Sequence, residues 1–357
     1  MGAPEHTDQP FIAWSYADDW NLSPKVLRRS TAAQLHAAMA SLEPFVGRPA
    51  IEGVIVYDKL DAALAVADLM GQQGRSLPRD LEGEPANPLF DEAELCASMN
   101  RHRTTAMLHE GSQGMLITLA QDPNRRLLLL PQREAVGFSP LGRSPNEGTG
   151  ADRLGLLAHE LAHAGDYARG RPGRPSEAEC FSGCVPRHAK AIQDVSDMAL
   201  AEYVATRAEC TAQVALMGAC SAELTRRITS LGRATFAPIL APVGDVSPAT
   251  GQQAQIDRHH FGYVVGTLAA YADAKAPIAD RFGTDTGRTT DTAVAEAYPR
   301  GSGLVKTVAR AIPALHRAAL EPTVVNRVHL ASALEVALVG QEAHTETQIQ
   351  KRSNMAR

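Results

Sequence analysis

The sequence lacks the long apolar stretches that insertion into a membrane requires. No window approaches the roughly 18 uninterrupted apolar residues of a membrane-spanning helix. The first twenty residues also lack the basic segment followed by an apolar one that is typical of a secretory signal peptide. We therefore expect no membrane partner. The expected location is the cytoplasm, or secretion without a classical signal peptide and delivery into a target cell.

Cysteine and excess positive charge are also scarce. The five cysteines are an odd number and form no CxxC pair, which favours reduced, mostly buried thiols over a disulfide framework. Lys and Arg total 35 against 40 Asp and Glu, so the formal net charge is -5. Because the basic residues are scattered as well, no surface for nucleic acid is expected.

The remaining composition is that of a folded globular protein. Hydrophobic residues make up 44% of the chain and charged residues 21%, well away from the composition of disordered chains. A length of 357 residues allows either one large domain or two smaller ones.

Hydrophobic periodicity predicts a mixed N-terminal half. Helical spacing covers 30–45, 60–70 and 91–108, and an apolar β-type run covers 53–57. Two further β-type runs, 115–119 and 126–130, flank the turn formers Asp122, Pro123 and Asn124, which predicts a hairpin at the edge of a sheet.

The rest of the chain is predicted to be largely helical. Thr149 and Asp152 have the spacing of a capping box, so a helix should begin there and end near Gly170, with Leu154, Leu157 and Leu161 as its buried stripe. Further predicted helices cover 189–217, 222–230, 252–275, 305–319 and 324–343. The fold class is therefore α+β and predominantly helical.

One motif on the predicted helix after Thr149 is typical of metal-dependent hydrolysis. His159, Glu160 and His163 form the pattern H-E-x-x-H. Residues i and i+4 share a helix face, so both imidazoles can reach one zinc ion at about 2.0 to 2.1 Å. Glu160 then lies beside the metal, where it can take a proton from the attacking water and return it to the leaving amine.

A catalytic zinc site needs a third protein ligand and an open fourth position. No histidine follows His163 at the distance of a third ligand on the same segment. Glu202, in the middle of the predicted helix over 189–217, is the first choice, and a solvated surface glutamate is the alternative reading of this residue. Glu209 lies on about the same face and is either the alternative ligand or a hydrogen-bonding partner of the site.

The stretch LLAHELAHAGDYARG, followed by a helical glutamate, resembles the gluzincin metallopeptidases. It is most similar to clostridial neurotoxin light chains and to bacterial effector proteases that are injected into host cells. The resemblance covers about residues 114–215 and implies a zincin-like catalytic domain, ligand roles for His159, His163 and Glu202, and a base role for Glu160. One zinc ion per chain and an intracellular protein substrate are implied in the same way. Where the neurotoxin pattern has another histidine, this sequence has Gly165 and Asp166.

Several polar residues are candidates for supporting roles. Asp166 lies one turn after His163 and could orient a ligand imidazole, or form a salt bridge with Arg169. Stabilising a developing oxyanion needs a hydrogen-bond donor. The available donors in the helical C-terminal half are Tyr203, Arg207, His259, His260 and Tyr263.

These observations predict three regions: a mixed α/β region over 1–110, a zincin catalytic core over 111–235, and a helical region over 236–357 that could be continuous with the core. The leading hypothesis is a zinc endopeptidase acting on a protein or peptide. A catalytically silent zinc-binding regulatory protein is the second hypothesis, and a helical interaction protein with an accidental motif is the third.

Overall fold

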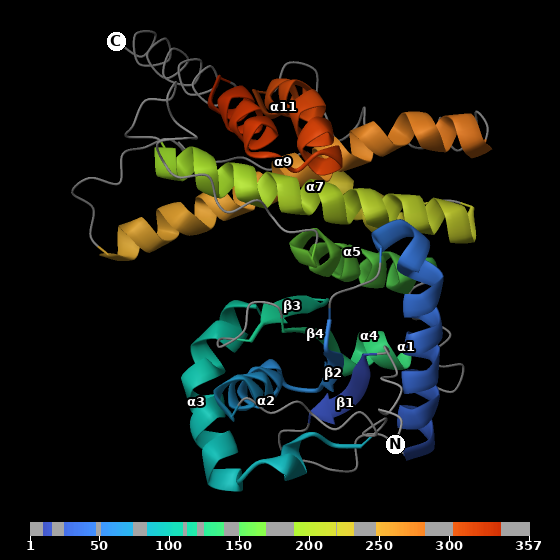
Figure 1. The fold of residues 1–357 in the computed structure, drawn as a ribbon, viewed down its shortest axis with the longest axis vertical. Coiled ribbons are helices and arrows are strands. Elements are labelled where there is room, and N and C mark those ends of the chain that lie inside the picture. The colour runs from blue at the N-terminus through green and yellow to red at the C-terminus, as the bar shows by residue number, and fades with distance from the viewer. Residues whose placement is uncertain are drawn as a thin grey trace, which may run out of the picture. The chain divides into compact units, whose positions relative to one another are not determined.

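The computed structural model describes residues 10–15, 25–47, 51–73, 84–109, 113–119, 125–138, 150–168, 189–218, 220–231, 248–282 and 303–336. These residues form an α+β structure that is mostly helical and contains one four-stranded mixed sheet (Figure 1). The chain divides into two compact units, Met1–Ala168 and Arg169–Arg357. No helix within the described ranges combines the length and the hydropathy that crossing a membrane would need.

The sheet belongs to the first unit and has the strand order β1-β2-β4-β3. Its strands are β1 (Phe11–Ser15), β2 (Gly53–Tyr57), β3 (Met115–Thr118) and β4 (Arg126–Pro131). Strands β1, β2 and β4 run parallel, and β3 runs antiparallel to β4. The predicted hairpin is thus confirmed, and β3 is an end strand of the sheet. Because β2 and β4 are buried along their whole length, they read as continuous apolar runs, as strands covered on both faces do.

Helices cover this sheet. They are α1 (Lys25–Val46), α2 (Leu60–Gln73), α3 (Glu92–Leu108), α4 (Gln132–Val136) and α5 (Gly150–Ala168), with a short 3-10 turn at Asn87–Leu89. One apolar cluster joins Ile55, Leu127 and Leu129 of the strands to buried side chains of α2 and α3. Helix α1 packs against α4 and α5. The structure confirms the helices expected over 30–45, 60–70 and 91–108, with α1 beginning earlier than expected.

Helix α5 carries the H-E-x-x-H motif and packs closely against the end of α1. A Cβ atom on Gly165 would lie 2.6 Å from the backbone oxygen of Val46, so only glycine permits this approach. Leu157 and Leu161 are buried as expected, whereas Leu154 is only half-buried. The expected cap, Thr149, lies outside the described residues.

The second unit is helical throughout its described part. It contains α7 (Ala189–Met217), α8 (Ala222–Leu231), α9 (Pro248–Phe282), α11 (Gly303–Leu320) and a helix over 324–336. The predicted bounds of α7 are confirmed, while α9 extends beyond the predicted 252–275 at both ends. Helices α7 and α9 pack together and share a core with α11 that includes Tyr203, Phe261 and Tyr271.

The sequence predicts three regions, 1–110, 111–235 and 236–357, of which the last could be continuous with the second. The strand pairs β1–β2 and β2–β4 join the region 1–110 to the segment that follows it, so one sheet spans the expected boundary at 110. Helices α7 and α9, which pack along each other, likewise span the expected boundary at 235.

Asp68 connects α2 to α3 by hydrogen bonds. Its carboxylate accepts from Ser98 at 2.9 Å, from Arg101 at 2.9 Å and from Gln72 at 2.8 Å. Partial burial alone would raise the pKa of Asp68, but these bonds outweigh burial and lower the pKa from 3.8 to about 2.

The low pKa of Asp68 predicts a loss of stability in acid. A group whose pKa is lower in the folded state contributes stability above its unfolded pKa, and this contribution is lost as the pH falls through the folded pKa. We expect the free energy of unfolding to fall by on the order of 1 kcal/mol between pH 4 and pH 2 through this group, after screening by solvent. Urea titrations at several pH values measure this fall. In Asp68→Asn the pH dependence should be shallower, and an unchanged slope would remove Asp68 from the explanation.

Candidate metal centre

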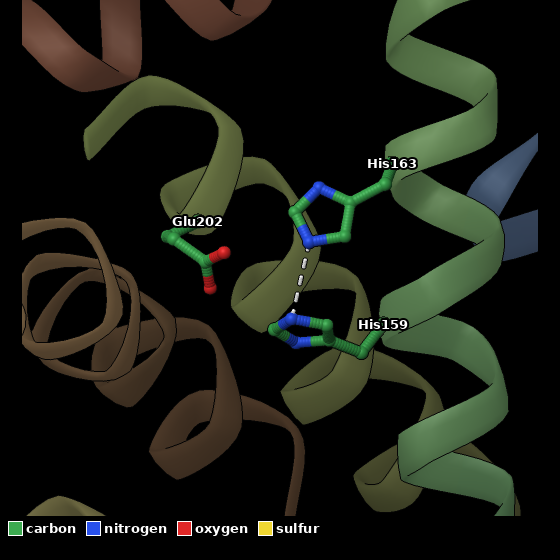
Figure 2. Close-up of side chains that lie close together, drawn as sticks. All are labelled: His159, His163 and Glu202. Carbon is green, nitrogen blue, oxygen red and sulfur yellow. Dashed lines mark hydrogen bonds between the residues drawn. The ribbon is translucent and has the colours of Figure 1, made fainter. Parts of the chain in front are cut away.

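The two histidines of the motif face each other on α5. The Nε2 atoms of His159 and His163 are 3.2 Å apart, and the two rings are edge to face with centroids 4.9 Å apart (Figure 2). His159 is buried and His163 is half-buried. The helical spacing of four residues therefore brings the two imidazoles together, as the sequence predicts.

The distance between the two nitrogen atoms matches that of two ligands on one zinc ion. Two nitrogens at about 2.0 to 2.1 Å from a tetrahedral ion are about 3.3 Å from each other. The observed separation of 3.2 Å is close to this value. The pair is thus spaced to hold one ion without a change in the backbone.

Glu160, between the two histidines, is buried with 9% of its surface exposed. Its side chain lies against Gly114, immediately before β3. A Cβ atom on Gly114 would lie 3.0 Å from Cγ of Glu160 and 3.2 Å from its Cδ, which is tighter than most real contacts. The absence of a side chain at position 114 therefore leaves the room that the Glu160 carboxylate occupies.

Glu202 lies in the middle of α7 and only 8% of its surface is exposed. Burial excludes the alternative reading of Glu202 as a solvated surface residue. His159, His163 and Glu202 form a group that could hold a metal ion (Figure 2). Carboxylate and imidazole are both donors that divalent zinc accepts.

Glu209, the other candidate ligand, is engaged with a cation. Its carboxylate forms an ion pair with Arg227 of α8, and both side chains are largely buried. Burial alone would lower the pKa of Arg227, but the Glu209 charge outweighs it and raises the pKa. The described group that could hold a metal includes Glu202 and not Glu209. Arg227 was not singled out from the sequence, because no local pattern marks it.

Tyr263 of α9 lies within electrostatic range of this charged cluster. Burial raises the pKa of Tyr263, Arg227 lowers it, and the carboxylates of Glu202 and Glu209 raise it further. Tyr263 is thus one of the hydrogen-bond donors named from the sequence, and the charge of Glu202 raises its pKa.

Tyr203 and Arg207 belong to a different cluster. The Tyr203 hydroxyl donates to Asp273 at 2.5 Å, and Nδ1 of His316 lies 3.1 Å from the same carboxylate oxygen. Arg207 lies 3.4 Å from Asp273 and 3.0 Å from Nδ1 of His316. Burial, followed by the bond to Asp273, raises the pKa of Tyr203. The two residues therefore contact Asp273 and His316.

The other candidates are placed as follows. His259 and His260 are exposed on α9. The side chain of Asp166 lies outside the described residues. Three cysteines are described without a disulfide: Cys210 is buried, Cys220 is half-buried and Cys96 is exposed, so the expectation of buried thiols holds for only part of this set.

Comparison of the chain with protein-family models, with curated proteins and with solved structures finds no match.

Proposed function

We propose that the chain is a zinc-dependent endopeptidase with a zincin-like catalytic domain. His159, His163 and Glu202 would hold the ion, and Glu160 would act as the general base. The observation that carries the proposal is the 3.2 Å separation between Nε2 of His159 and Nε2 of His163. Both residues lie on one helix, and the residue directly after His159 is the buried Glu160. The motif supplies residue types that bind zinc, and the distance between the two nitrogen atoms matches that of two ligands on one zinc ion.

The donor set favours zinc over the hard cations. Two imidazoles and one carboxylate are typical of catalytic zinc sites, which keep a fourth position open, whereas magnesium and calcium prefer oxygen ligands. When bound, a zinc ion would polarise water and the scissile carbonyl group.

The residues of the chain would supply the proton transfers. Glu160 would accept a proton from the attacking water and later donate it to the leaving amine. Burial of Glu160 beside Gly114 holds its carboxylate in place. Tyr263, whose raised pKa keeps its hydroxyl protonated, is a candidate donor to the developing oxyanion.

An extended peptide is the substrate form that the sheet favours. Strand β3 stands at the end of the order β1-β2-β4-β3, so one edge of β3 has no neighbouring strand in the described sheet. Such an edge can pair with the backbone of an extended peptide. Gly114 contacts Glu160 and immediately precedes β3, so a peptide paired with β3 would begin next to the proposed base.

Metal content tests this proposal. We expect the purified full-length protein to bind one zinc ion per chain, and His159→Ala and His163→Ala each to weaken zinc affinity about 100-fold, because each removes a ligand. Elemental analysis and competition with a chelating dye measure stoichiometry and affinity. Zinc should also raise the melting temperature of the wild type more than that of either variant.

His259→Ala is the matched control, because His259 is an exposed histidine on α9. It should bind zinc with wild-type affinity. A wild-type protein that binds no stoichiometric zinc would rule out the proposed centre and favour an accidental motif. Equal losses in His259→Ala and His163→Ala would place the ion elsewhere.

A further inference from the structure

A pocket of about 430 Å³ opens in the first unit where two parallel strands end. Tyr57 and Pro131, the last residues of β2 and β4, are neighbours in the sheet register and both line the pocket. The turn from β2 into α2 and the end of α3 complete the wall. Ligands of sheets with parallel strands commonly bind outside the carboxyl ends of the strands. None of the proposed zinc ligands lines this pocket.

Tyr57 brings a hydroxyl donor to this pocket. Only 6% of the Tyr57 surface is exposed, and its hydroxyl forms no hydrogen bond with the part of the chain that the structure describes. Burial raises the pKa of Tyr57 to about 12 despite the opposing effect of Arg133. The hydroxyl therefore stays protonated at neutral pH, and it can donate a hydrogen bond to an acceptor on a ligand in the pocket.

Positive charge surrounds this donor. Lys59, Arg103 and Arg133 line the pocket together with His109. Within the described residues no acidic side chain pairs with Arg103, whereas Arg133 lies 3.3 Å from Glu134. Arginine is well suited to bind carboxylate and phosphate groups, since its guanidinium can donate two parallel hydrogen bonds.

Two carboxylates also line the pocket but do not cancel this charge. One oxygen of Asp61 accepts from the backbone N–H of Ala62 at 2.9 Å, and Asp58 is exposed. The lining therefore contains three cationic and two acidic side chains. Part of the wall is apolar: Leu60, Ala106 and Met107 also line the pocket, and 68% of the Met107 surface is exposed.

We infer that this pocket binds a carboxylate or phosphate group carried on a small apolar body. The Tyr57 hydroxyl donates to the anion, Arg103 and Arg133 pair with it, and the apolar body lies against Met107. The group can come from an acidic side chain of a peptide or from a free small organic anion. The charge of Glu160 also raises the pKa of Tyr57, so the two side chains interact electrostatically. If the anion is a side chain of a peptide substrate, that acidic residue would bind near the proposed base, and this part of the inference rests on the proposed function. The binding of an anion in the pocket does not depend on that function.

Isothermal titration calorimetry on the full-length protein tests this inference with three probes. They are phenyl phosphate and two capped pentapeptides that differ only in a central Glu or Gln. We expect at least one acidic probe to bind, with Tyr57→Phe weakening it about fivefold and Arg103→Gln about tenfold, since a charge-assisted hydrogen bond is lost in the second case. Arg101→Gln is the matched control, because Arg101 lies two residues away on α3 and bonds to Asp68 instead. It should bind as the wild type does.

The outcomes separate the two sources and the two sites. Binding of the Glu peptide but not the Gln peptide assigns the pocket to an acidic side chain, and binding of phenyl phosphate alone assigns it to a free anion. The same affinities in His163→Ala show that the pocket acts independently of the zinc centre, so a failed zinc proposal leaves this result standing. If neither acidic probe binds below about 10 mM, or if both pocket variants bind as tightly as the wild type, the inference is overturned.

Discussion

Glu160→Gln is expected to lose proteolytic activity by about 10²- to 10⁴-fold in kcat/KM while retaining zinc. The amide has nearly the shape of the carboxylate, so it fits the space beside Gly114. It cannot accept the proton of the attacking water or return one to the leaving amine. Because Glu160 is not one of the three residues that could hold the metal, the proposed ligands stay in place. Release of dye from labelled casein, measured with matched zinc content, gives the comparison.

The same substitution elsewhere separates catalysis from loss of charge. Glu94→Gln removes one carboxylate from an exposed position in the first turn of α3 and should cleave casein at the wild-type rate. A Glu160→Gln protein that binds zinc and cleaves as fast as the wild type would contradict the base role. A zinc-loaded wild type without activity on any tested protein would instead favour the zinc-binding regulatory hypothesis.

Local patterns predicted most of the secondary structure because each of these elements carries its own signal. The hairpin β3–β4 had turn formers between two apolar runs, and α7 had an uninterrupted helical pattern between two loops. Strand β1 was not predicted. It has only five residues and pairs with Gly53–Tyr57, about forty residues later, so what makes it a strand is a distant partner.

The candidate site shows the same limit. The positions of His159 and His163 follow from helical geometry, so the sequence suffices for that pair. For the two glutamates the sequence does not suffice, because Arg227, which pairs with Glu209, comes from another helix. Tyr203 is one of the hydrogen-bond donors that the sequence offers in the helical C-terminal half, but it bonds to Asp273, 70 residues further along the chain. Sequence spacing alone does not reveal contacts of this kind.

Gly266→Val is expected to lower the free energy of unfolding by about 4 kcal/mol, roughly a thousandfold in the folding equilibrium. A Cβ atom at position 266 would lie 2.2 Å from the backbone oxygen of Ala199 and 2.9 Å from Cβ of Glu202. The first of these contacts involves backbone, so no side-chain rotation relieves it, and α7 and α9 must move apart. Replacing glycine in a helix gains less than about 1 kcal/mol of helix propensity, so overpacking decides the sign.

Urea denaturation and the melting temperature measure this effect, with a fall of about 10 °C expected for a unit of this size. His259→Val introduces the same side chain at an exposed position of α9 and should change the free energy of unfolding by less than about 1 kcal/mol. Since Cβ of Glu202 is one of the atoms that the new valine side chain would displace, zinc affinity should fall as well in any fraction that folds. If Gly266→Val were as stable as the wild type, the close packing of α9 on the segment Ala199 to Glu202 would be wrong, and with it the reason why Glu202 is held in place.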